Sequence, residues 1–171
     1  MANAKVIFLI GMPAAGKTYW GEKVAGRYKM TFVDLDSFIA EQEKASISAL
    51  FAAYGENGFR EKEHKCLKKL IHNAVTDTVV ACGGGAPCFN SNIQLMKDAG
   101  IVIYLQADVA TLVIGLNGSE EIRPLLKGRG DMAAYLEGLL QKRKFFYEQA
   151  DHILQTKDIS LTTFAEIISH V

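Results

Sequence analysis

The sequence has little cysteine and no excess of charge of either sign. Its three cysteines, Cys66, Cys82 and Cys88, form neither an even disulfide set nor a metal-ligand spacing, which argues against a disulfide framework and a zinc site. We expect reduced thiols in a cytoplasmic protein. Lysine plus arginine and aspartate plus glutamate each number 19, so the chain has no charge excess with which to coat a nucleic acid. We therefore expect no nucleic-acid partner.

Long hydrophobic runs, repeats and linkers are also missing. The N-terminal apolar run is short and is interrupted by Gly11 and Pro13, so it predicts neither a signal peptide nor a membrane-spanning helix. No low-complexity segment divides the 171 residues, and a chain of this length can bury roughly 70% of its unfolded surface as one unit. We expect a single domain over residues 1–171 that is monomeric and has no membrane partner.

What the sequence does contain is an alternation of short apolar runs and helical patterns. The runs are rich in β-branched residues and lie at 5–10, 31–35, 78–82, 101–105 and 152–156. Apolar residues with a helical spacing occupy 59–74, 136–147 and 161–168. Continuous apolar strands are typical of a parallel sheet covered on both faces, so the pattern predicts an α/β, three-layer fold with five strands.

The stretch GMPAAGKT at 11–18 has the phosphate-loop pattern G-x-x-x-x-G-K-[ST], between a predicted strand and a predicted helix. Such a match arises by chance in roughly one chain in 200 of this length, the alternative being a glycine-rich turn with an incidental lysine. We expect Lys17 to reach the β- and γ-phosphates of a nucleoside triphosphate and the Thr18 hydroxyl to ligate Mg²⁺. The predicted nucleotide-binding residues of this loop are Gly11, Ala14, Ala15, Gly16, Lys17 and Thr18.

Two acids and three glycines follow the next two predicted strands. If the strand in FVDLD continues to its last residue, Asp34 and Asp36 point the same way. The alternative for Asp36 is an N-cap of the helix that follows. Ligands of open parallel sheets bind beyond the carboxyl ends of the strands. We therefore expect the phosphate loop, the acid pair and the glycines at 83–85 to line one crevice.

The sequence lacks the Asn-Lys-x-Asp motif of GTPases and the Leu-Ser-Gly-Gly-Gln signature of transporter ATPases, which leaves a small kinase as the simplest reading. From Val6 to about Thr156 it resembles the shikimate kinase family. The resemblance rests on the phosphate loop, FVDLD, GENGFREKE (55–63), GGG (83–85), RPLL (123–126) and RKFFYEQA (143–150), in this order. It implies a nucleoside-monophosphate-kinase-like fold with strand order 2-3-1-4-5. The implied reaction transfers the γ-phosphate of ATP to the 3-hydroxyl of shikimate, in aromatic amino-acid biosynthesis.

The resemblance also implies a role for each matching residue on the acceptor side. It places Asp34 near Mg²⁺, through water, and Asp36 on the acceptor hydroxyl, whose proton it can take. Arg60 and Arg143 match the arginines that bind the substrate carboxylate, and guanidinium groups suit that task because they bind carboxylates with two hydrogen bonds. Glu63 would orient Arg60. The alternative for both arginines is a solvated helix face, on which Arg60 would pair with a neighbour one turn on.

Glycines and a lid complete the implied site. The family match makes Gly83, Gly84 and Gly85 a segment whose backbone approaches the substrate closely, because no Cβ intervenes. Arg123 matches the arginine of a mobile lid at about 116–131, which closes over the phosphates and joins Lys17 and Asp36 as catalytic residues. The helices that bind the substrate would span about 36–74.

Two departures from the family pattern are visible. Ala15 stands where the family usually has glycine, and Ala14 where it often does; alanine suits the loop only if its φ is below zero. The segment 112–121 lacks the arginine that commonly stacks on adenine. Two alternatives stay open. One is another small-molecule kinase of the same fold, acting on gluconate or a nucleotide. The other, which these departures motivate, is a non-catalytic nucleotide-binding relative.

Overall fold

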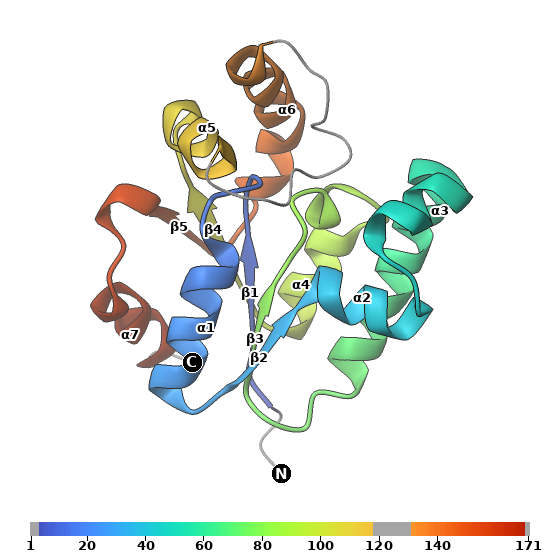
Figure 1. Ribbon diagram of the computed structural model, residues 1–171. Helices are drawn as coiled ribbons and strands as arrows, with labels where there is room; N and C mark the ends of the chain where they lie inside the picture. Colours follow the sequence, from blue (N-terminus) through green and yellow to red (C-terminus); the bar gives the residue numbers. More distant parts are fainter. Residues whose placement is uncertain (1–3, 118–130, 170–171) are drawn as a thin grey trace.

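The computed structural model describes residues 4–117 and 131–169, and a sheet of five parallel strands forms its centre. The strands are β1 (Val6–Ile10), β2 (Thr31–Asp34), β3 (Thr78–Ala81), β4 (Ile101–Gln106) and β5 (His152–Gln155). Their order is β2-β3-β1-β4-β5 (Figure 1), so the expected strand order and the α/β class are confirmed. Each strand lies within one residue of the bounds predicted from the apolar runs.

Helices cover both faces of this sheet. They are α1 (Lys17–Tyr28), α2 (Leu35–Glu43), α3 (Ile47–His72), α4 (Asn92–Ala99), α5 (Val109–Asn117), α6 (Met132–Tyr147) and α7 (Leu161–Ser169), with short 3₁₀ turns η1 (Ala86–Cys88) and η3 (Thr156–Asp158). Figure 1 shows α1 and α7 on one side of the sheet and α3 and α4 on the other. The Trp20 and Phe164 rings, 5.7 Å apart, join α1 to α7. The predicted three-layer arrangement is therefore present.

The hydrophobic core is centred on β1. Every residue of this strand is buried, and Leu9 lies between Ala81 of β3 and Ile103 of β4. From β1 the chain runs to β2, toward one edge of the sheet, and later from β3 to β4, toward the other edge. The carboxyl end of β1 is therefore a topological switch point. Loops that leave the sheet here start from a rigid, close-packed base, as a binding site requires.

The strand in FVDLD does not continue to Asp36, so the condition for both carboxylates to point the same way is not met. Strand β2 ends at Asp34, whose Oδ1 accepts a hydrogen bond of 3.0 Å from the Ser37 backbone N–H, and helix α2 begins at Leu35. Asp34 is therefore the N-cap, and the alternative that gave Asp36 this role is wrong. The physical reason is that aspartate is among the best N-caps, so the helix begins directly after it. Asp36 lies in the first turn, where the helix dipole favours a negative charge.

Helix α3 has one break in its helical backbone. Gly55 has φ 65° and ψ −176° inside the helix, a conformation that an L-residue rarely adopts. The kink separates the first turns of α3 from the long segment that carries Arg60 and Glu63. Among the residues that the structure describes, no helix combines the length and apolar character needed to cross a membrane.

Candidate active site

The phosphate loop connects β1 to α1 in the backbone conformation that the motif demands. Gly11 has φ 144°, and a Cβ on it would lie 2.6 Å from the carbonyl oxygen of Leu105. Gly16 has φ 86° and directly precedes α1. The buried Lys17 donates hydrogen bonds of 2.9 and 2.7 Å to the carbonyl oxygens of Gly11 and Met12. The loop thus holds an ammonium group and a helix N-terminus together, an arrangement that suits a polyphosphate.

Ala14 departs from the condition expected of it. Its φ is 63°, in the left-handed region, whereas Ala15 has no positive φ. The condition of φ below zero is therefore met at Ala15 and not at Ala14. Alanine in this region is disfavoured by about 1–2 kcal/mol, because its Cβ crowds the following carbonyl. The methyl group of Ala14 fits because Gly115 of α5 has no side chain. A Cβ added to Gly115 would lie 2.9 Å from the Cβ of Ala14.

Thr18 and Asp34 form the oxygen pair that could hold a divalent cation. The Thr18 hydroxyl donates a hydrogen bond of 3.0 Å to Asp34 Oδ2, while the other carboxylate oxygen caps α2. Within residues 4–117 and 131–169, no group of three or more His, Cys, Asp or Glu side chains could hold a metal. This donor set fits Mg²⁺, which commonly takes one or two protein oxygens and completes its shell with phosphates and water.

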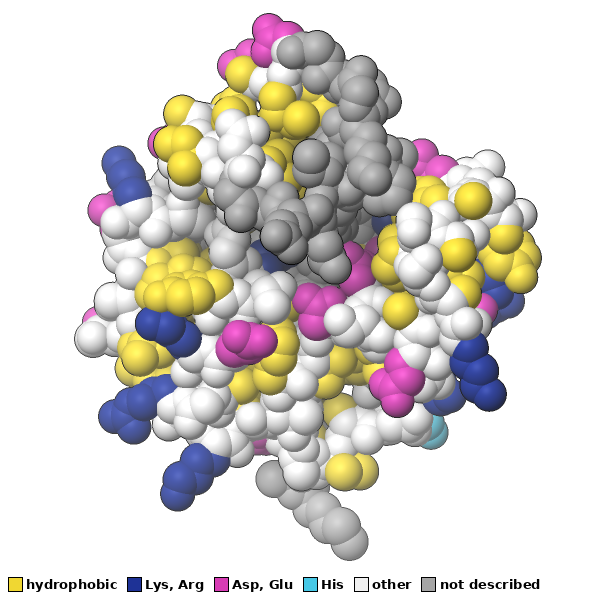
Figure 2. Space-filling model, viewed as in Figure 1, with side chains coloured by type: hydrophobic (Ala, Val, Ile, Leu, Met, Phe, Trp, Pro, Cys, Tyr) yellow, Lys and Arg dark blue, Asp and Glu magenta, His cyan; other side chains and the backbone are white. Residues whose placement is uncertain are grey.

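Asp36 and Glu63 meet at the first of the three glycines. A Cβ added to Gly83 would lie 2.8 Å from Asp36 Oδ1 and 3.4 Å from Glu63 Oε1. Both carboxylates therefore reach the Gly83 backbone, one from α2 and the other from α3. Figure 2 shows acidic side chains gathered near the middle of this face. The sequence-predicted convergence of the acid and the glycine segment is present, although Asp36 arrives on a helix rather than on a strand.

The other two glycines make room for the two arginines. A Cβ on Gly84 would lie 2.9 Å from Arg143 Nη1, and one on Gly85 would collide with the guanidinium of Arg60. Arg60 and Arg143 are only 5% and 8% exposed, so neither lies on a solvated helix face, although the alternative's pairing of Arg60 with a neighbour one turn on, Glu63, is present. Burial requires a partner for each guanidinium nitrogen or leaves a penalty of about 1–3 kcal/mol or more.

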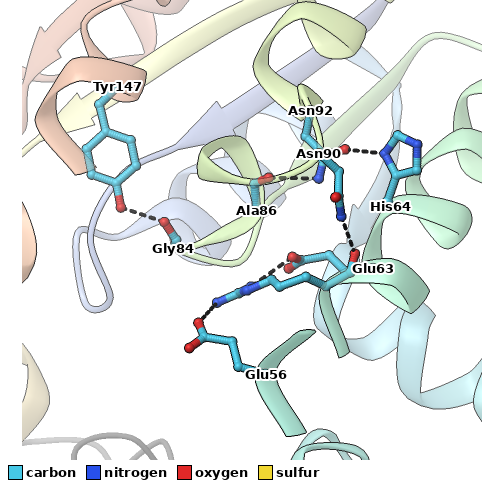
Figure 3. Close-up of polar contacts among 9 residues, drawn as sticks. Glu56, Glu63, His64, Gly84, Ala86, Asn90, Asn92 and Tyr147 are labelled. Carbon is cyan, nitrogen blue, oxygen red and sulfur yellow. Dashed lines mark hydrogen bonds and ion pairs between the residues drawn. The ribbon is translucent and has the colours of Figure 1, made fainter. Parts of the chain in front are cut away.

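The partners of the two arginines differ. Arg60 Nη1 donates to Glu63 Oε2 at 2.8 Å and Nη2 contacts Glu56 Oε1 at 3.4 Å, as the dashed lines near Glu63 and Glu56 in Figure 3 show. Arg143 Nη1 is buried and has no hydrogen-bond partner among the described residues. A buried cationic donor of this kind, next to a second arginine across the glycine segment, is suited to an anionic ligand.

Tyr147 is a site residue that the sequence reasoning missed. Its hydroxyl donates a hydrogen bond of 2.6 Å to the carbonyl oxygen of Gly84 (Figure 3). Burial raises the pKa of this hydroxyl well above its usual value, although Arg143 acts in the opposite direction, so the donor stays protonated. The signal was present in RKFFYEQA, because Tyr147 follows Arg143 by four residues and shares its helix face.

The remaining predicted site residue, Arg123, lies outside the described residues, as does nearly all of the predicted lid. The segment 112–117 ends α5 and indeed places no arginine beside the phosphate loop. The described part of the site therefore consists of the phosphate loop, the Thr18–Asp34 pair, Asp36 with Glu63, the three glycines and the two buried arginines.

Known proteins resemble this chain over nearly its whole length. A family model described as shikimate kinase matches residues 13–171. The shikimate kinase of Phocaeicola vulgatus is 38% identical over 155 residues, which cover 90% of this chain and 87% of that protein. The shikimate kinase of Clostridium botulinum strain Loch Maree is 38% identical over 149 residues, with coverages of 86% and 85%.

Solved structures agree with the sequence relatives. A shikimate kinase from Bacteroides thetaiotaomicron has a TM-score of 0.90 at 30% identity and covers 96% of this chain and 98% of its own. A shikimate kinase from Acinetobacter baumannii in complex with shikimate has a TM-score of 0.85 at 31% identity, with coverages of 98% and 92%. With this geometry and similarity along nearly its full length, the chain belongs to the shikimate kinase family.

Proposed function

We propose that this protein is an ATP-dependent shikimate kinase, which transfers the γ-phosphate of ATP to the 3-hydroxyl of shikimate and releases ADP and shikimate 3-phosphate. The observation that carries the proposal is the pair of buried arginines around the glycine segment, of which Arg143 presents an unpartnered Nη1. An acceptor with a carboxylate beside its hydroxyls supplies the anion that this pair requires.

Asp36 is the residue that we assign to the acceptor hydroxyl. Its Oδ1 would lie 2.8 Å from a Cβ on Gly83, and the next two glycines border the guanidinium groups of Arg143 and Arg60. Phosphoryl transfer passes through a loose transition state, in which positioning and charge neutralisation matter more than a strong base. Asp36 would orient the hydroxyl toward the γ-phosphate and accept its proton as the bond to phosphorus forms. Lys17, and Arg123 from the predicted lid, would neutralise the charge on the phosphate oxygens.

Magnesium is the cation that we infer for the Thr18–Asp34 pair. Thr18 Oγ1 would bind it directly, and Asp34, as the family resemblance implies, through water; the Asp34 oxygen beside Thr18 is not the one that caps α2. Held by Thr18 and Asp34, Mg²⁺ would reduce the negative charge on the phosphate oxygens of ATP. Thr18→Val keeps the shape of the side chain and removes the hydroxyl. ADP release by this variant should require an Mg²⁺ concentration more than about 10-fold higher than in the wild type. An unchanged Mg²⁺ dependence would reject this assignment.

The decisive experiment for the function is a substrate panel. Purified protein with ATP and Mg²⁺ is tested for ADP release with shikimate, gluconate and nucleoside monophosphates. We expect turnover with shikimate only. Turnover with gluconate or a nucleotide instead would favour another kinase of this fold, and no turnover by folded protein would favour a non-catalytic relative.

A matched pair of aspartate variants then tests the assignment of Asp36. Asp36→Asn should reduce turnover by at least about 10³-fold while ATP still binds, because the hydroxyl loses its proton acceptor. Asp98→Asn is the control, since Asp98 is an exposed residue of α4 that contacts only Gln94 among the described hydrogen bonds. Equal activity in the two variants would contradict the assignment.

We also infer a monomeric, cytoplasmic protein that binds neither nucleic acid nor a membrane. The balanced charge, the ordinary composition and the free thiols of Cys66, Cys82 and Cys88 support this inference. Light scattering would measure the oligomeric state, and cell fractionation would locate the protein.

A further inference from the structure

The turn that joins η1 to α4, residues 89–91, has an unusual backbone, and Asn92 follows it as the first residue of α4. Asn90 and Ser91 have φ of 52° and 56°, so two consecutive residues other than glycine lie in the left-handed region. Each such residue is disfavoured by about 1–3 kcal/mol and persists only where surrounding contacts impose the conformation. Asparagine tolerates this region better than most residues. The contacts that impose this turn therefore identify what it holds in place.

One half of the turn holds Arg60. The Asn90 side chain donates a hydrogen bond of 3.0 Å to the backbone carbonyl oxygen of Arg60, as the dashed line from Asn90 in Figure 3 shows. The Phe89 ring lies beside the guanidinium, with its centroid 4.5 Å from Cζ. An aromatic face attracts a guanidinium and limits the directions it can take. The turn thus contacts Arg60 at both its backbone and its charged end.

Asn92, which follows the turn, holds the glycine segment against α3. Asn92 is fully buried, and its Nδ2 donates a hydrogen bond of 2.8 Å to the carbonyl oxygen of Ala86, which directly follows the glycines. Its Oδ1 lies 2.6 Å from His64 Nδ1 (Figure 3). Since the Asn92 amide nitrogen already donates, its oxygen accepts, and His64 Nδ1 carries the proton. The amide therefore bridges helix α3 and the end of the glycine segment.

We propose that Asn90 and Asn92, together with His64, are positioning residues that set Arg60 and the segment Gly83–Gly85 at the separation an anionic acceptor requires. None of the three touches the reacting atoms. They act through Arg60 and through the backbone that faces the acceptor. This inference rests on the proposed function, because it names the residues that shape the acceptor half of the same site.

A pair of glycine variants separates positioning from stability. Asn90→Gly removes the hydrogen bond to Arg60, yet it also relieves the left-handed strain. Ser91→Gly relieves the same strain at the adjacent residue, whose side chain makes no hydrogen bond among the described residues. We expect Asn90→Gly to raise the shikimate KM about 3- to 10-fold, the effect of losing one hydrogen bond, with the ATP KM unchanged. Ser91→Gly should leave both constants unchanged, and neither variant should lower Tm.

Variants of His64 test the hydrogen bond between His64 and Asn92. Asn has an amide nitrogen close to the place of Nδ1, so His64→Asn should preserve the donor to Asn92, whereas His64→Leu removes it. We expect the shikimate KM to rise in His64→Leu and to return toward the wild-type value in His64→Asn. This ordering does not depend on the behaviour of Asn90→Gly.

The outcomes distinguish this inference from the function on which it rests. No turnover of shikimate by the wild type would overturn the proposed function and this inference with it. Turnover by the wild type, with Asn90→Gly equal to Ser91→Gly and His64→Leu equal to His64→Asn, would overturn the inference alone. Parallel rises in the shikimate and ATP constants would also overturn it, because they would indicate a general loss of structure.

Discussion

The Tyr147 hydroxyl is hydrogen-bonded to the carbonyl oxygen of Gly84 over 2.6 Å, which ties helix α6 to the middle of the glycine segment. The same helix carries Arg143, whose Nη1 would contact any Cβ on Gly84. One helix therefore supplies both the buried charge beside Gly84, which we propose binds the acceptor, and the bond that holds the Gly84 backbone in place.

Tyr147→Phe tests this bond. The change leaves the buried Gly84 carbonyl without its donor, so we expect a loss of about 1–2 kcal/mol in the free energy of unfolding and a higher shikimate KM. Tyr104→Phe is the control, because Tyr104 is equally buried and its ring lies 4.9 Å from that of Tyr147, yet its hydroxyl makes no hydrogen bond among the described residues. Denaturant unfolding measures the free energy of unfolding of both variants, and steady-state kinetics measure their shikimate KM. Similar values for the two variants would contradict the role of the bond.

Arg143→Ala should act on the acceptor and spare the nucleotide. Arg143 is buried beside Gly84, whereas the neighbouring Lys144 is exposed and pairs with Glu148 at 3.5 Å. Loss of a charged hydrogen-bonding group from a buried site corresponds to about 2–3 kcal/mol, so the shikimate KM should rise about 30- to 150-fold with little change in the ATP KM. Lys144→Ala should leave both constants near the wild-type values. An equal rise in the ATP KM for Arg143→Ala would show that our division of the site is wrong.

Ala14 and Gly115 should behave as a coupled pair. Ala14→Gly relieves the left-handed conformation and should stabilise the protein by about 0.5–1 kcal/mol, after allowance for the greater freedom of glycine in the unfolded chain. Gly115→Ala should destabilise it, because the new Cβ would lie 2.9 Å from that of Ala14. The double variant should recover much of that loss. Thermal unfolding of the four proteins measures the coupling, and strict additivity would contradict the contact.

Cys88 should make stability depend on alkaline pH. Burial raises the pKa of this thiol from 9.0 to about 11, while the nearby Arg143 and Arg60 act to lower it. The folded chain therefore holds the proton more tightly than the unfolded chain. Its contribution to stability is complete below pH 9.0 and is lost as the pH rises through about 11.

Cys88→Ser provides the comparison for this pH dependence. Other groups titrate in the same range, but they do so in both proteins. The free energy of unfolding, measured in denaturant from about pH 8 to about pH 11, should fall more steeply for the wild type than for Cys88→Ser. Parallel profiles would show that the thiol does not titrate differently in the folded chain.

Local sequence patterns were sufficient to predict the strands and the phosphate loop on which the site is built. The five apolar runs became the five strands, and GMPAAGKT became a loop with Gly11 and Gly16 at positive φ. Their success has a physical cause, because strand periodicity and glycine-dependent turns are decided by neighbouring residues. The strand in FVDLD ends before Asp36 for a related reason. Asp34 is a good N-cap, so helix α2 begins directly after it and the strand stops there.

Only the tertiary structure decided how the pieces of the site meet. The burial of Arg60 and Arg143, the bond from Tyr147 to Gly84 and the links from Asn90 and Asn92 to α3 join residues far apart in the chain. Contacts of this kind depend on how α3 and α6 pack against the glycine segment, and no local pattern contains that information. The sequence by itself thus determined the strands, the phosphate loop and the family. The packing of helices on the sheet decided which charges are buried, because burial is a property of the whole fold.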